Sequence, residues 1–143
     1  MDFFQELKNL ADALDACAVD YALCGGVPRA TQDIDLLIRP EDLGRLRETA
    51  RSCGFVLESL PMDFSSGITI QRFTKLIDGQ PLVLDALLVG SILQRAWDDR
   101  QTAEIEGGRM RVVSREGLIA LKLAAGRAQD LVDVQRLQEI SRG

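Results

Sequence analysis

The hydrophobic positions of this chain recur with helical spacing at its start and with strand-like spacing in several later segments. Between Asp2 and about Ala18, apolar residues fall every three or four positions, which predicts an amphipathic helix. These residues are Leu7, Leu10, Ala11 and Leu14. Two short apolar runs then predict strands at residues 21–24 and 33–38. The next predicted helix runs from Pro40, which is tolerated in a first helical turn, to about Gly54.

The pattern in the second half of the chain predicts hairpins separated by helices. Asp78-Gly79 predicts a hairpin turn between a strand that ends at Ile77 and a returning strand at 81–89. The elements expected after it are a short helix from a Ser91 cap to about Asp99, a hairpin of 102–106 with 110–113, a helix from a Ser114 cap through Ala125, and a helix at 130–140. No repeat or linker divides the sequence. We therefore expect one α+β domain over residues 1–143, a mixed β-sheet with flanking helices and a C-terminal helical pair at about 115–141.

Composition narrows the class of protein. The 143 residues are 46% hydrophobic and 27% charged, as in a soluble globular domain. The absence of histidine excludes triads that use His and zinc sites ligated by His. Cys17, Cys24 and Cys53 are predicted to be small buried residues. A net charge of −5 argues against an extended nucleic-acid footprint, and the lack of a secretion signal or a membrane-length apolar run predicts a cytoplasmic protein.

Asp33-Ile34-Asp35 is the most informative motif of the sequence. Side chains of a strand repeat every second residue, so both carboxylates leave the same face. Like charges this close repel one another unless something positive lies between them. A hard divalent cation such as Mg²⁺ prefers carboxylate oxygens and leaves room for substrate phosphates, so the motif indicates phosphate chemistry. The alternative is that the two acids cap local structure.

Asp85 is the candidate for a third carboxylate. It interrupts the apolar run 82–88, where a lone charge is costly unless it is paired or bound to a metal. If its strand lies beside residues 33–38, the three acids meet, and two metal ions that clamp a nucleotidyl displacement need such shared oxygen ligands. The sequence leaves this adjacency open. The alternative is that Asp85 ends a strand and points into water.

The glycine pair Gly25-Gly26 comes directly after the first predicted strand. Glycine allows close backbone approach and unusual dihedral angles, so a strand that ends in Gly-Gly can offer N–H groups to a phosphate. The pair is thus a second feature that points to phosphate, although a purely structural turn is the alternative.

Taken together, these segments resemble the nucleotidyltransferase fold of the DNA polymerase β type, especially the small prokaryotic toxin–antitoxin nucleotidyltransferases (AbiEii-type). The matching segments span most of the chain in the expected order: residues 21–26, 28–37, 83–85 and 117–133. The resemblance implies that Gly25 and Gly26 contact the triphosphate. It implies that Asp33 and Asp35 bind Mg²⁺ or Mn²⁺, with Asp85 as the third metal-binding acid and a candidate base. The implied reaction transfers a nucleoside monophosphate from an NTP to an acceptor hydroxyl and releases pyrophosphate.

One segment departs from the family pattern. Similar proteins carry a longer insert with a short helix between the glycine motif and the acids, whereas only the six residues 27–32 intervene here. An anion site on a helix N-terminus would lose its amides and its dipole, which predicts impaired NTP binding. Arg29 and Thr31 are candidates to replace the lost phosphate contacts, through a guanidinium fork and a hydroxyl. An exposed turn is the alternative for this segment.

Lys122 is a further candidate for nucleotide binding. It stands in a predicted apolar helix. A lysine in such a helix can extend its ammonium group to water, form an ion pair with an acidic residue or contact a phosphate. Pairing with Asp130 or Asp133 and contact with a nucleotide phosphate are the two interpretations that the resemblance favours.

These residues support two functional hypotheses. The first is a Mg²⁺-dependent nucleotidyltransferase that uses an NTP and a protein or RNA acceptor, and the three candidate acids support it. The second is a catalytically weakened domain of the same fold that acts as a binding partner of a cognate toxin or antitoxin, and the short segment 27–32 supports it. A generic α+β scaffold with coincidental motifs explains the order of the motifs less well.

Overall fold

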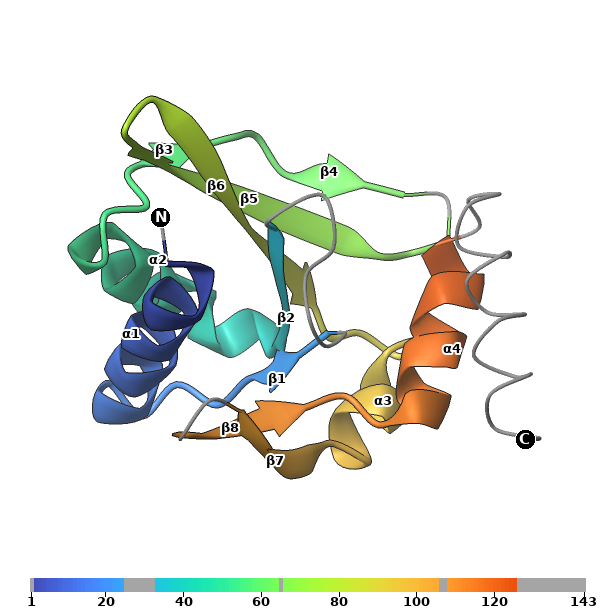
Figure 1. Cartoon of the computed structure of the whole chain (residues 1–143). Helices are drawn as coiled ribbons and strands as arrows, with labels where there is room; N and C mark the ends of the chain where they lie inside the picture. The colour runs from blue at the N-terminus through green and yellow to red at the C-terminus, as the bar shows by residue number, and fades with distance from the viewer. Residues whose placement is uncertain (1, 25–32, 65, 106–107, 126–143) are drawn as a thin grey trace.

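The computed structural model describes residues 2–24, 33–64, 66–105 and 108–125, which form a mixed β-sheet with flanking helices (Figure 1). Seven of the strands lie in the order β3-β5-β6-β2-β1-β8-β7, and β4 pairs with β5 beside this path. The strands are β1 (Ala22–Leu23), β2 (Asp33–Ile38), β3 (Leu57–Glu58), β4 (Met62–Asp63), β5 (Thr69–Ile77), β6 (Gln80–Leu88), β7 (Gln101–Ile105) and β8 (Gly108–Val112). The helices are α1 (Phe3–Ala16), the 3₁₀ turn η1 (Pro40–Asp42), α2 (Leu43–Ser52), α3 (Gln94–Asp98) and α4 (Arg115–Ala125).

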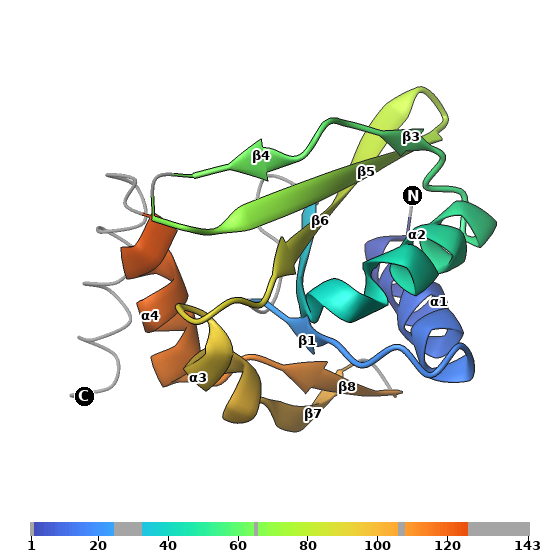
Figure 2. The same cartoon turned by 180° about the vertical axis from the view of Figure 1, so that it is seen from behind.

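Two pairs of helices cover the sheet from opposite sides. The pair α1 and α2 lies on one side and the pair α3 and α4 on the other, as two opposite views show (Figure 1 and Figure 2). β2 contributes to both cores because its side chains alternate between the faces. Ile34, Leu36 and Ile38 join the core of α1 and α2, whereas Leu37 joins the core of α3 and α4. This alternation confirms the predicted strand and puts Asp33 and Asp35 on the Leu37 face.

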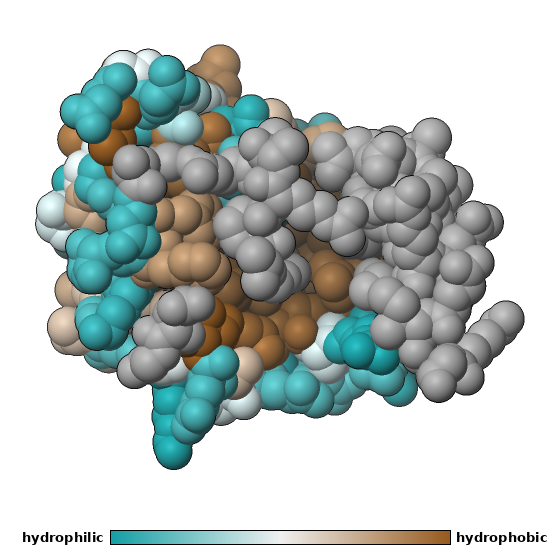
Figure 3. Space-filling view, viewed as in Figure 1, coloured by the Kyte–Doolittle hydropathy of each residue, from teal (hydrophilic) through white to brown (hydrophobic). Residues whose placement is uncertain are grey.

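The surface of the molecule shows both polar and apolar regions. From the side of Figure 1, hydrophobic surface shows in the middle of the face around β1, and hydrophilic residues border it (Figure 3). In the part of the chain that the structure describes, no helix combines the length and the hydrophobicity that a membrane span needs.

Most predicted helix boundaries are confirmed, and one cap is wrong. Asp2 caps α1, since its Oδ1 accepts a hydrogen bond from the backbone N–H of Gln5 at 3.2 Å. Ser114 caps α4 through the N–H of Gly117 at 3.1 Å. The predicted Ser91 cap is wrong because residues 91–93 form a turn, and α3 begins only at residue 94 without a side-chain cap.

The burial predicted for the cysteines is only partly found. Cys17 is exposed, and Cys24 and Cys53 are half-buried. Cys17 and Cys53 occupy the C-cap positions of α1 and α2, where the chain leaves the helix at the border of the core. Apolar neighbours in the sequence were therefore not sufficient evidence that the cysteine side chains are buried.

A two-residue turn sets the register of the hairpin between β5 and β6. Asp78 and Gly79 both have positive φ, 52° and 78°, which is the conformation of the type I′ turn predicted from Asp-Gly. Ile77 therefore pairs with Gln80, and every step back along β5 is matched by one step forward along β6.

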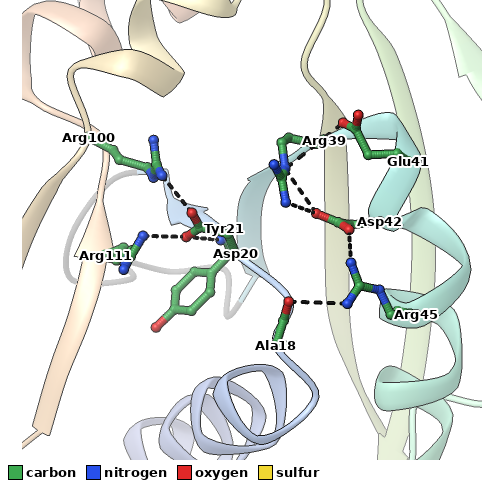
Figure 4. A network of polar contacts seen from close by, with 9 residues as sticks. All are labelled: Ala18, Asp20, Tyr21, Arg39, Glu41, Asp42, Arg45, Arg100 and Arg111. Carbon is green, nitrogen blue, oxygen red and sulfur yellow. Dashed lines mark hydrogen bonds and ion pairs between the residues drawn. The ribbon is translucent and has the colours of Figure 1, made fainter.

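Arginine–carboxylate contacts fasten the segment that leads into β1 (Figure 4). Asp20 accepts hydrogen bonds from Arg100 at 2.6 Å and from Arg111 at 2.7 Å. On the other side, Arg45 of α2 donates to the carbonyl oxygen of Ala18 at 3.3 Å. The short strand β1, which has only one parallel register pair with β8, thus gains side-chain anchors on both sides.

The turn between β5 and β6 gives a matched pair of glycine substitutions. We expect Gly79→Ala to lower the free energy of unfolding by about 1 kcal/mol, because alanine resists a positive φ. A Cβ at residue 79 would meet no atom within 4 Å, so the cost is conformational alone.

The matched control is Gly44→Ala in α2, where an added Cβ also meets no atom within 4 Å. This substitution should raise the free energy of unfolding by about 0.5 kcal/mol, because alanine restricts the unfolded chain more than glycine does. Urea denaturation of both variants checks the opposite signs; equal effects would contradict the turn geometry.

The single tyrosine gives a pH-dependent prediction. Burial and the nearby carboxylate of Asp15 raise the pKa of Tyr21 above its ordinary value of 10.0. The folded state therefore holds the phenolic proton more tightly than the unfolded state, and stability should fall as the pH rises above about 10. Absorbance titration of the phenol should give a midpoint above that of the protein in denaturant, and Asp15→Asn should lower it. A native midpoint at or below the denatured one would contradict this environment.

Candidate active site

Three carboxylates predicted from the sequence share one face of neighbouring strands. β2 and β6 are parallel, and their register makes Asp35 the direct partner of Asp85. Asp33 lies two residues earlier on β2 and therefore on the same face. Asp85 is 8% exposed, Asp35 is half-buried and Asp33 is exposed. The adjacency that the sequence left open is present, and Asp85 does not end its strand or point into water.

A fourth side chain on this face, Arg72 of β5, holds Asp85. Arg72 is the antiparallel partner of Asp85, so its side chain leaves the sheet on the same side. Its Nε donates to Oδ1 of Asp85 at 2.8 Å and its Nη2 donates to Oδ2 at 3.0 Å. This bidentate geometry is the strong form of an arginine–carboxylate pair. We call Asp33, Asp35, Asp85 and Arg72 the acid face.

Sequence reasoning missed Arg72, although a signal for it was present. The Asp78-Gly79 turn predicts that Ile77 faces the residue directly after the turn. Ile77 pairs with Gln80. Counting five residues back from Ile77 along β5 gives Arg72, and counting five residues forward from Gln80 along β6 gives Asp85, so these two residues are also partners. Counting register from the turn would therefore have placed a guanidinium beside the buried carboxylate.

The four side chains of the acid face form one electrostatic group. Although Asp33 is exposed, its carboxyl group is partly desolvated, which raises its pKa; the negative charge of Asp85 raises this pKa further, and the guanidinium of Arg72 lowers it. The pKa of Arg72 is raised chiefly by its hydrogen bonds with Asp85, and the charges of all three acids also favour its charged form. Arg72 and the three carboxylates therefore influence one another's ionisation.

The donor chemistry of the acid face suits a hard divalent cation, but not in the form of three shared carboxylates. Carboxylate oxygens are the ligands that Mg²⁺ prefers. Among the described residues, however, no group of three His, Cys, Asp or Glu side chains is placed to hold one metal ion. Both oxygens of Asp85 accept hydrogen bonds from Arg72. The described geometry of the acid face therefore does not show a metal site, and magnesium stays a prediction.

The predicted nucleotide-binding residues are mostly outside the described part of the chain. Gly25, Gly26, Arg29 and Thr31 all belong to the range 25–32, which the structure does not describe. The same holds for the predicted helix at 130–140 with its acids. Lys122 stands in α4, and its side chain is not described. The predictions made for these residues stay predictions.

Comparison with known proteins supports the fold. No family model matches the sequence, and no curated protein shows significant similarity to it. A "putative nucleotidyltransferase" (TM1012) from Thermotoga maritima has a TM-score of 0.64 and 17% sequence identity, and the match covers 96% of this chain and 93% of that one. JHP933 from Helicobacter pylori has a TM-score of 0.50 and 19% identity, with 96% of this chain and 65% of that chain covered.

At these identities the likeness concerns the fold. The chain has a nucleotidyltransferase-like α+β fold, a mixed sheet with flanking helices, which confirms the predicted fold class. The toxin–antitoxin type stays a prediction.

Crowded carboxylates predict a substitution that stabilises the protein. Since the raised pKa of Asp33 means that its charged form is disfavoured in the folded state, Asp33→Asn should raise the melting temperature at pH 7. Asp12→Asn, at an exposed position of α1, removes the same charge away from the acid face and is the matched control. Thermal unfolding of both variants checks the difference. A lower melting temperature for Asp33→Asn alone would mean that the Asp33 charge stabilises the fold.

Proposed function

We propose that this protein is a Mg²⁺-dependent nucleotidyltransferase that transfers a nucleoside monophosphate from an NTP to a hydroxyl of a protein or RNA acceptor. The observation that carries the proposal is the register of β2 with β6, which sets Asp35 beside Asp85 with Asp33 on the same face. The nucleotidyltransferase-like fold supports it. A face of carboxylates without a histidine is suited to phosphoryl chemistry through a bound cation.

Each residue of the acid face has a role in this proposal. Asp33 and Asp35 would hold the cation, and the bound cation would stabilise the negative charge that develops on the phosphates. The acceptor oxygen bonds to the α-phosphorus, the bond from that phosphorus to the pyrophosphate oxygen breaks, and the hydroxyl proton leaves. Asp85 is the base that we propose for this proton, and Arg72, which donates two hydrogen bonds to it, would fix its orientation.

The second candidate function is a catalytically weakened domain that binds a cognate toxin or antitoxin. It is favoured by the engagement of both Asp85 oxygens with Arg72 and by the short segment between the glycine pair and Asp33. In this case the acid face would no longer support transfer, while the fold would still serve as a binding surface.

A transfer assay tests the enzyme. Purified protein is incubated with each of the four α-phosphate-labelled NTPs, Mg²⁺ or Mn²⁺, and total cellular protein and RNA as acceptors. We expect label to appear in one acceptor class and to fall by about two orders of magnitude or more in Asp35→Asn, because charge stabilisation at the phosphates is lost. Asp12→Asn is the control and should label as the unaltered protein does.

The same assay distinguishes the two functions. If no acceptor is labelled and calorimetry with all four NTPs shows no metal-dependent heat, the enzyme is excluded and the binding domain takes its place. Labelling that is unchanged in Asp35→Asn would exclude the acid face as the catalytic site.

A further inference from the structure

One buried aspartate holds two arginines beside the segment that leads into β1 (Figure 4). The carboxylate of Asp42, which is 1% exposed, accepts hydrogen bonds from Nη2 of Arg39 at 2.9 Å and from Arg45. The side chains of these two arginines are 44% and 51% exposed. This group therefore presents guanidinium to water, while the carboxylate that fixes it is covered.

A second aspartate holds two more arginines on the other side of that segment. Asp20 accepts hydrogen bonds from Arg100 at 2.6 Å and from Nη1 of Arg111 at 2.7 Å. The guanidinium of Arg100 also lies 4.2 Å from the centre of the Trp97 ring and donates to the carbonyl oxygen of Trp97 at 2.8 Å. The Arg111 side chain is 49% exposed. Because a guanidinium has five N–H donors, Arg111 keeps donors for a further partner.

The two groups lie close together. Arg45 donates to the carbonyl oxygen of Ala18 at 3.3 Å, and Asp20 follows two residues later, at most about 7 Å along the chain. The pKa of Arg39 is raised chiefly by its hydrogen bonds with Asp42, and the charge of Asp20 raises it as well. The four arginines that share this region are called the arginine surface: Arg39, Arg45, Arg100 and Arg111.

The arginine surface carries more positive charge than its acids neutralise. One arginine would neutralise each aspartate, yet each aspartate holds two. Glu41 reaches Arg39 only at 3.9 Å and is 70% exposed, and an ion pair of this kind contributes little. Two guanidiniums gathered on one carboxylate repel each other, and an anion that contacts both relieves the repulsion. In a chain with a net charge of −5, this local surplus points to an anionic partner.

The surroundings of the arginine surface favour phosphate over an acidic protein. Among the described residues, the large apolar side chains that are exposed lie between Val56 and Leu76, at Ile92 and at Leu123, outside the segments that carry the four arginines. The centre of a protein–protein interface is apolar, whereas interfaces with nucleic acids are more polar and more positively charged. Arginine also matches the oxygens of a phosphate with paired N–H groups.

We propose that the arginine surface binds the phosphate backbone of single-stranded RNA over a few nucleotides. Two anchored pairs of guanidiniums suit two or more successive phosphates, and a footprint this short is compatible with the net charge of −5. The choice of RNA rests on the proposed function, whose acceptor is protein or RNA, but binding does not need transfer. Arg39 follows the last residue of β2 and Asp33 is the first, so the two sites lie at opposite ends of this strand.

Salt-dependent binding tests the inference. The fluorescence anisotropy of a labelled single-stranded RNA of about ten nucleotides is measured against the full chain over a range of KCl concentrations. We expect the logarithm of the association constant to fall with the logarithm of the salt concentration, with a slope of about −1.4 to −2.8 for two to four phosphate contacts. Arg111→Gln and Arg39→Gln should each weaken binding about fivefold at 0.1 M salt and reduce the slope by about 0.7. The double variant should lose about 25-fold, because the two arginines belong to different groups.

Matched variants separate the surface from general charge and from folding. Arg47→Gln removes the same charge from an arginine that pairs with Glu58 elsewhere on α2, and it should bind as the unaltered protein does. Arg111→Lys keeps the charge and should keep the slope. Circular dichroism and thermal unfolding identify any variant that fails to fold. If Arg111→Gln does not fold, Arg39→Gln carries the test, since Asp42 then keeps Arg45.

The results also separate this inference from the proposed function. Absence of binding at low salt, binding that does not depend on salt, or equal affinities of Arg47→Gln and the double variant would each overturn the RNA surface. An acidic peptide of the same charge that binds as tightly as the RNA would overturn it in favour of an acidic protein partner. Transfer to RNA that is unchanged in the double variant at low RNA concentration would overturn the surface and leave the nucleotidyltransferase standing. The expected pattern of binding without any transfer would support the surface and remove the enzyme.

Discussion

The pairing of β2 with β6 is the constraint on which the rest of the structure depends. Its parallel register sets Asp35 beside Asp85, and the neighbouring strand β5 brings Arg72 to the same place. The opposite face holds this register, because Ile34 and Leu84 are buried there, and a slip of one residue would exchange them for charged side chains. The hydrophobic core of α1 and α2 thus determines where the polar groups of the other face meet.

Much of the fold could be predicted because its signals are local. The period of apolar residues marked β2 and α1, and the Asp78-Gly79 turn fixed a hairpin down to its backbone dihedral angles. The neighbour of β2 could not be predicted in this way, since α2 and three strands lie between β2 and β6 in the chain, and no local pattern encodes a parallel pairing across that distance. Ser91 failed for a related reason: serine favours turns as well as caps, and the turn prevailed.

The three aspartates of the candidate site could be predicted from the sequence, whereas the arginine that neutralises one of them was not. An isolated aspartate in an apolar run indicates that a partner exists, but leaves the kind of partner open. Sequence reasoning chose a metal ion for Asp85, whereas the structure supplies Arg72. At Asp33, partial desolvation and the like charge of Asp85 both raise the pKa of the carboxyl group, which disfavours its ionisation. A carboxyl group whose pKa is shifted by its neighbours in this way is a candidate for a functional site.

An arginine and a metal ion solve the same electrostatic problem with different consequences. A bound ion can leave or be replaced, and its loss exposes the carboxylates to one another; a guanidinium on β5 is present whenever the hairpin is folded. Asp85 is therefore satisfied without any ligand, and its burial is not evidence for a metal. The choice between an enzyme and a binding domain consequently depends on Asp33 and Asp35, the two acids that β2 brings to this face.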